Sequence, residues 1–188
     1  MQRLLMLCIL FIVCITPIFG APNNLLSAGT IPYGTIPIGS SAEIFNLGFG
    51  INAFVSYIPA LFRYVGIGAG ADFMLLPLEA IDSVWTFAGS LGPVFRLPLG
   101  ERFAVHADAT LGYYYWGPVR WDAEEGNGGG LSLGAGIGAS YNIVGPFSVG
   151  VGAAYNYYGK LYNGFSFSIA ARLDFPVGKL VTPYGEKG

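Results

Sequence analysis

Apolar and polar residues alternate with a period of two along most of this chain. In residues 45–57, an apolar residue occupies every second position, and mostly Gly, Asn and Ser stand between them. A strand places alternate residues on opposite faces, whereas a helix scatters such a set around its axis. Glycine at alternate positions also disfavours a helix. The uncharged stretches 44–62 and 126–159 therefore predict strands rather than membrane helices.

The alternation recurs often enough to predict a barrel wall. It predicts strands at residues 45–57, 65–73, 85–97, 103–116, 131–142, 147–157 and 165–175. Single-chain bacterial membrane barrels have an even number of strands, so one more is expected. The candidates are residues 25–33, where Pro32 disfavours a strand interior, and the tail at 180–184. We favour residues 25–33 because both chain ends then lie on the periplasmic side.

The predicted fold is all-β: a transmembrane, antiparallel, up-and-down barrel of eight strands. Short connections alternate with longer, more polar ones, as periplasmic turns and external loops do in such barrels. Aromatic residues should form two belts on the outward face. The external belt is expected to hold Phe45, Phe73, Trp85, Phe87, Tyr113, Tyr115, Tyr155, Tyr157, Phe165 and Phe167, and the periplasmic belt Tyr57, Phe95, Phe103, Tyr141, Phe147 and Phe175.

The composition supports an apolar exterior. Charged residues make up 11% of the chain, against roughly 25% in soluble domains. A soluble lipocalin-like barrel would need a charged outer face, which this pattern does not supply. The formal net charge is −2 and the Lys and Arg residues are scattered, so no nucleic-acid partner is expected.

Residues 1–20 are predicted to be a signal peptide. Arg3 precedes an apolar run at 4–13, which is shorter than the roughly 20 residues of a membrane helix. Pro17 ends the segment before the expected cleavage after Gly20. We expect the barrel over residues 21–176 and a short periplasmic tail over 177–188.

Both cysteines fall within this predicted signal peptide. They are Cys8 and Cys14, so the mature barrel would hold no disulfide and no thiolate metal site. A lipoprotein acylated at Cys14 is the alternative, which Val13 disfavours because the residue before such a cysteine is normally small.

Residues 165–175 resemble the C-terminal β-signal of outer-membrane proteins. That signal alternates apolar residues and ends in an aromatic one, and the positions that match are Phe165, Phe167, Ile169, Leu173 and Phe175. Up to Phe175, the predicted mature chain resembles small OmpA-, OmpX- or OmpW-type eight-stranded barrels. The resemblance implies a Gram-negative-type outer membrane, with its lipids and the barrel-assembly machinery as partners. Residues 176–188 are far too few for the peptidoglycan-binding domain of OmpA relatives.

Inward-facing charges are the candidate functional residues. An eight-stranded barrel is just wide enough for side chains to fill it, and charges buried there should pair across the lumen. The network is either a structural plug or a gate for small solutes, as OmpA-type barrels suggest, and His106 would make such a gate pH-sensitive. The turn near residue 100 is expected to set Val94 opposite His106. The candidates are Arg96, His106, Asp108, Arg172 and Asp174, with Asp72 and Glu43 towards the external half.

Other inward positions leave two interpretations open. Glycines at 66–70, 134–138 and 150–152 either permit tight curvature or leave a thin path through the lumen. At the external mouth, Tyr114, Trp116 and Tyr158 either line an opening for solutes or fill it.

Passive, porin-like passage of small solutes is the leading functional hypothesis. The OmpW-type resemblance adds a variant in which apolar solutes enter from outside and leave sideways into the membrane. The alternative is a structural or host-interaction barrel that acts through its loops without conductance, and the acidic loop at 117–129 is the best surface for it. An enzyme is not expected, because the one histidine, His106, faces inward near the periplasmic end. No cofactor or metal is expected.

Overall fold

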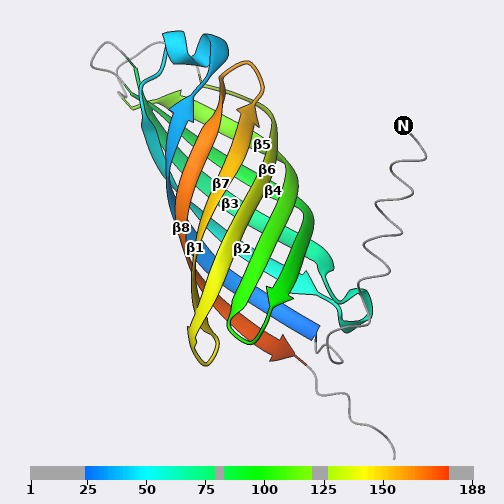
Figure 1. The fold of residues 1–188 in the computed structure, drawn as a ribbon. Helices are drawn as coiled ribbons and strands as arrows, with labels where there is room; N and C mark the ends of the chain where they lie inside the picture. Colours follow the sequence, from blue (N-terminus) through cyan, green and yellow to red (C-terminus); the bar gives the residue numbers. More distant parts are fainter. Residues whose placement is uncertain (1–23, 79–82, 120–126, 178–188) are drawn as a thin grey trace, which may run out of the picture.

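Eight antiparallel strands close into one barrel in the computed structural model, which describes residues 24–78, 83–119 and 127–177 (Figure 1). Each strand pairs with the next along the chain, and the first pairs with the last. The predicted up-and-down topology is confirmed. The elements are β1 (Asn24–Pro37), η2 (Gly39–Glu43), β2 (Gly48–Ile58), η3 (Ala60–Phe62), β3 (Val65–Pro77), β4 (Ser83–Leu99), β5 (Phe103–Pro118), β6 (Gly128–Val144), β7 (Phe147–Tyr158) and β8 (Tyr162–Val177).

The N-terminal segment supplies the eighth strand, as we favoured. β1 begins at Asn24 opposite Val177 of β8, so both described chain ends lie at one end of the barrel. Short turns also lie at this end, which we therefore take as the periplasmic end. Pro32 stands in the middle of β1, and the pairing with β8 stops at Ile31 and resumes at Tyr33. Proline has no N–H for the ladder, which explains this gap in the closing seam between β1 and β8.

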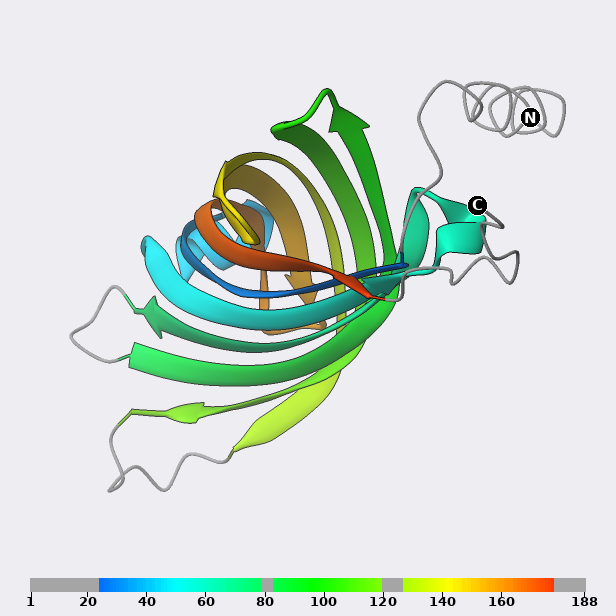
Figure 2. The ribbon, with the colours of Figure 1, turned by 90° about the horizontal axis from the view of Figure 1, so that it is seen from below.

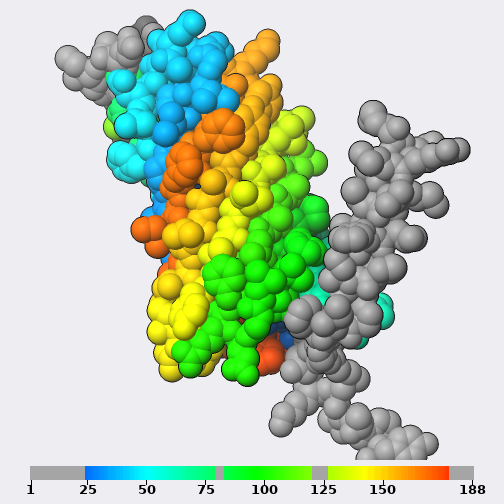
Figure 3. Space-filling view, viewed as in Figure 1, coloured from blue at the N-terminus to red at the C-terminus, as the bar shows by residue number. Residues whose placement is uncertain are grey.

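The exterior of the barrel is apolar. Odd-numbered residues of β2 to β8 and even-numbered residues of β1 face outward, and many of their large apolar side chains are exposed. Figure 3 shows one side of this exterior, a continuous surface of side chains over β5 to β8. Every aromatic residue of the two predicted belts except Phe45 stands at an outward-facing strand position.

Phe45 corrects the prediction of a strand starting at residue 45. β2 begins only at Gly48, and Phe45 lies after η2, where its N–H donates to the Ser41 carbonyl at 2.9 Å. The chain turns inward there, and the ring is buried against Tyr162 with the two ring centroids 6.1 Å apart. The side chain therefore packs inside the barrel instead of facing lipid.

The pairing of β4 with β5 differs by two residues from the prediction. Arg96 stands directly opposite His106, and Val94 stands opposite Asp108. The turn spans only residues 100–102, and Gly100 adopts a φ of 86° that glycine tolerates. This tighter turn brings the arginine and the histidine level with each other.

Several sequence predictions fall outside the described residues. They concern the signal peptide at 1–20, most of the tail after Val177, and the acidic part of the loop at 117–129. Within the described ranges, no helix has the length and hydrophobicity needed to cross a membrane.

Candidate functional site in the barrel lumen

A buried carboxylate organises the periplasmic half of the lumen. Arg96 Nη2 lies 2.9 Å from Asp174 Oδ2, and Arg172 Nε lies 3.0 Å from Asp174 Oδ1. The Ser27 hydroxyl donates to Oδ1 at 2.6 Å, and the Ser148 hydroxyl donates to Oδ2 at 3.3 Å. Asp174 thus connects side chains from β1, β4, β7 and β8 around a single acidic group.

His106 extends this group across the barrel. Arg172 Nη1 lies 3.0 Å from His106 Nδ1 and 3.2 Å from Nε2. Ser140 Oγ lies 2.6 Å from His106 Nε2, and the Arg172 guanidinium lies 5.2 Å from the centre of the Phe54 ring. We call Arg96, His106, Arg172 and Asp174 the charge cluster. Of the seven predicted lumen charges, these four contact one another across the lumen.

The Ser140 and His106 pair invites comparison with hydrolytic sites. A catalytic histidine in a Ser–His–acid site is oriented by a carboxylate that accepts its ring N–H. Here the other neighbour of His106 is Arg172, whose guanidinium has only donors. His106 therefore contacts an arginine where a catalytic histidine would contact a carboxylate, and this contact is structural. In residues 24–78, 83–119 and 127–177, no three His, Cys, Asp or Glu side chains gather to hold a metal.

Asp72 lies in the external half of the lumen, apart from the charge cluster. Tyr33 donates its hydroxyl to both carboxylate oxygens at 2.8 Å, and Tyr158 donates to Oδ1 at 3.0 Å. Phenol groups rather than cations therefore satisfy this carboxylate. Sequence reasoning missed Tyr33, because the weak alternation of β1 gave no indication of which face it occupied.

Apolar and aromatic side chains fill the external half of the lumen. Met74, Leu76 and Tyr162 are 1%, 0% and 1% exposed. The Tyr114 and Tyr158 rings meet edge to face with centroids 5.4 Å apart, and Trp116 packs against the same group. The three predicted mouth residues thus face inward and fill the mouth. We call this group the external plug, formed by Phe45, Met74, Leu76, Tyr114, Tyr158 and Tyr162.

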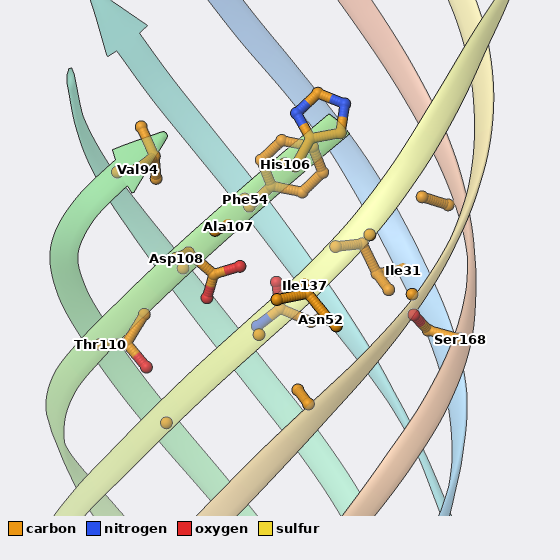
Figure 4. A pocket seen from close by; sticks show the side chains of 18 of the residues that line it. Ile31, Asn52, Phe54, Val94, His106, Ala107, Asp108, Thr110, Ile137 and Ser168 are labelled. Carbon is orange, nitrogen blue, oxygen red and sulfur yellow. The ribbon is translucent and has the colours of Figure 1, made fainter. Parts of the chain in front are cut away.

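A cavity of about 250 Å³ separates the two layers (Figure 4). It is lined by Tyr33, Asp72 and Tyr158 on one side and by Arg96, His106 and Arg172 on the other. Glycines of β3, β6 and β7 supply much of the wall between them. Gly66 has the other role considered for these glycines, since a Cβ there would collide with the Tyr57 carbonyl oxygen. The lumen glycines therefore leave space and also permit close strand approach.

Asp108 faces this cavity without a direct partner among the described residues. Figure 4 shows its carboxylate pointing into the same space as Thr110 and Asn52. It stands opposite Val94 and lies over Gly136, where an added Cβ would be 2.8 Å from Oδ1. Neither neighbour offers a side-chain donor, so this carboxylate remains accessible to a solute in the cavity.

Glu43 corrects the predicted network. It lies on η2 in an external connection and is exposed, so it does not face the lumen. The predicted lumen charges thus divide into the charge cluster, the separate Asp72 group and the cavity-facing Asp108.

Comparisons with known proteins identify the fold. No protein-family model matches the sequence, and no curated protein matches it significantly. Solved structures do match, including Ail, the attachment invasion locus protein of Yersinia pestis, with a TM-score of 0.54 and 16% identity over 82% of this chain and 99% of Ail. Neisserial surface protein A matches with a TM-score of 0.56 and 16% identity over 84% of this chain and 99% of that protein. OprG from Pseudomonas aeruginosa matches with a TM-score of 0.53 and 10% identity over 82% and 97%.

The fold is that of the eight-stranded outer-membrane barrels. The exterior of this protein agrees with that fold, because such barrels present an apolar strand surface with two aromatic belts to lipid. The residues of the resembling C-terminal signal, Phe165 to Phe175, likewise face outward on β8. The protein is therefore an outer-membrane β-barrel, as the resemblance implied.

Proposed function

We propose that this barrel passes small solutes through a gated lumen. The cavity between the external plug and the charge cluster carries the proposal. An eight-stranded barrel is just wide enough for side chains to fill its interior or for the interior to hold one small ligand. Here glycines and small residues leave open space in the middle of the lumen, with the external plug on one side of it and the charge cluster on the other.

The charge cluster suits a gate because Asp174 is shared. Breaking a buried ion pair by removing one partner costs roughly 3–5 kcal/mol. Since Arg96 and Arg172 both contact Asp174, either guanidinium can move while the other still neutralises the carboxylate. The movement therefore avoids leaving an unpaired acid in the lumen.

The cavity wall sets the expected solutes. Its volume admits only small molecules, and its lining combines glycine with Asn52, Thr110 and Asn156. Asp108 adds one negative charge that is not neutralised by direct contact. Small uncharged solutes therefore fit this wall best, because the charged groups that line it are two carboxylates, Asp72 and Asp108, and the two guanidiniums of the charge cluster.

The test is single-channel recording of the folded protein in a planar bilayer, with one inward and one outward variant. Ala170 lines the cavity, whereas the adjacent Ala171 faces outward and is exposed. Wild type should give small, intermittent openings. Ala170→Leu should abolish or strongly reduce them by filling the cavity, while Ala171→Leu should leave them unchanged.

A silent bilayer from correctly folded wild type would contradict the proposal. Equal currents from both alanine variants would also contradict it, because the cavity would then not be the path. A silent wild type that still moved apolar solutes across vesicles would favour lateral release, and the gap in the closing seam at Pro32 would be the first place to examine.

A further inference from the structure

The turn between β2 and β3 is apolar although it lies at a barrel end. Residues 59–63 read Pro-Ala-Leu-Phe-Arg, whereas the turn at 100–102, at the same end, reads Gly-Glu-Arg. Connections that face water are normally polar. The composition of this turn therefore indicates a surrounding other than water.

Leu61 and Phe62 are far more exposed than a short turn requires. The two residues are 84% and 61% exposed, although the neighbouring Ile58 and Tyr64 are buried. In Figures 1 and 2, the turn projects from the rim of the barrel beyond the ends of β2 and β3. Two large apolar residues that are adjacent in sequence thus lie on a turn that projects from the barrel.

The turn is held in a defined shape. The Ala60 N–H donates to Asn24 Oδ1 at 2.8 Å, which connects η3 to the start of β1. The Phe62 N–H donates to the Pro59 carbonyl at 3.0 Å. At its base, the Tyr64 carbonyl accepts the Arg96 N–H at 2.8 Å. These hydrogen bonds hold the backbone of the turn in a shape in which Leu61 and Phe62 point outward.

We propose that residues 59–63 insert Leu61 and Phe62 into the periplasmic leaflet of the membrane and anchor the barrel there. The flanking outward residues, Tyr57 and Val65, are exposed and belong to the apolar exterior. The apolar surface of the strands thus continues directly onto the turn. Leucine and phenylalanine at such a position partition into the boundary between headgroups and acyl chains. Lipid is therefore the occupant that the surface fits.

The test places a fluorescent reporter on the turn. Leu61→Cys is labelled with an environment-sensitive fluorophore in a Cys8→Ser, Cys14→Ser background and placed in nanodiscs of phosphatidylethanolamine and phosphatidylglycerol. Glu101→Cys, in the polar turn at the same end, is the matched control. The Leu61 label should show blue-shifted emission and lose fluorescence to lipids with a nitroxide near the headgroup. The Glu101 label should instead lose fluorescence to aqueous iodide.

Two results would overturn the anchor. A Leu61 label that is quenched by iodide and not by the nitroxide lipid would place the turn in water. A label protected from both quenchers would place it against protein, and crosslinking between copies would then identify a second chain. Neither outcome depends on whether the lumen conducts, so the anchor and the proposed passage are tested separately.

Discussion

At the scale of single residues, two carboxylates in one lumen have opposite surroundings. Asp174 contacts two guanidiniums and two serine hydroxyls. Asp108 lies over a glycine and opposite a valine, and faces the cavity. Removing the charge of Asp174 leaves Arg96 and Arg172 without their shared counter-charge, whereas removing that of Asp108 breaks no direct ion pair. The first carboxylate is therefore structural and the second is available to solutes.

We expect Asp174→Asn to lower the free energy of unfolding by about 3 kcal/mol, as the loss of one partner from a buried ion pair does. Asp108→Asn is the control and should change it much less. Urea unfolding of the barrel in lipid vesicles, followed by tryptophan fluorescence, measures both variants. Equal losses of stability would contradict the distinction between the two carboxylates.

The sequence predicted the meeting of the charge cluster because strict alternation determines which residues face inward. It could not predict the serine partners, since serine is common at inward positions and none stands out. It misplaced Glu43 because this residue lies just before the strand predicted from residue 45, whereas in the structure Gly39–Glu43 forms η2 and β2 begins only at Gly48. The alternation predicts which charges face inward but not which of them pair. Asp108, for example, faces the lumen without a direct partner.

At the scale of the strands, proline and glycine mark where the wall is irregular. The pairing of β4 with β5 has a gap at Gly92 and Pro93, as the closing seam has at Ile31 and Pro32. β1 was hard to predict because its two faces hardly differ: its outward face includes Thr30 and Gly34. Only the even strand number and the position of the chain ends favoured it.

Two glycines of β4 offer a matched test of this wall. A Cβ at Gly92 would collide with the Ala109 carbonyl oxygen, while a Cβ at Gly89 meets nothing within 4 Å. We expect Gly92→Ala to destabilise the barrel by about 2 kcal/mol, as overpacking commonly does. Gly89→Ala should be neutral or slightly stabilising. The same urea unfolding assay measures both, and a neutral Gly92→Ala would show that the strands can move apart there without cost.

At the scale of the whole molecule, two chemically different layers of side chains lie across the lumen. The external plug is apolar and aromatic, and the charge cluster is ionic. The cavity lies between them. The sequence predicted aromatic side chains at the mouth but left open whether they line or fill it, because that depends on the rotamers of Tyr114 and Tyr158. In the proposed passage, both layers must move.

Removing one ring from the external plug should therefore increase passage. Tyr158 contacts Tyr114, Tyr162 and Asp72, whereas the adjacent Tyr157 faces outward. We expect Tyr158→Ala to give larger or more frequent openings in planar bilayers and Tyr157→Ala to resemble wild type. Unchanged currents in Tyr158→Ala would mean that the external layer does not limit the flow.

The hydrogen bond between Ser27 and Asp174 joins residues 147 positions apart in the chain. It forms only after the last strand has been synthesised and brought back to the first. A chain that ends before β8 keeps Arg96 without its carboxylate and leaves β1 and β7 with open edges, which are templates for aggregation. A prematurely terminated chain therefore differs from a finished barrel in both charge and strand edges.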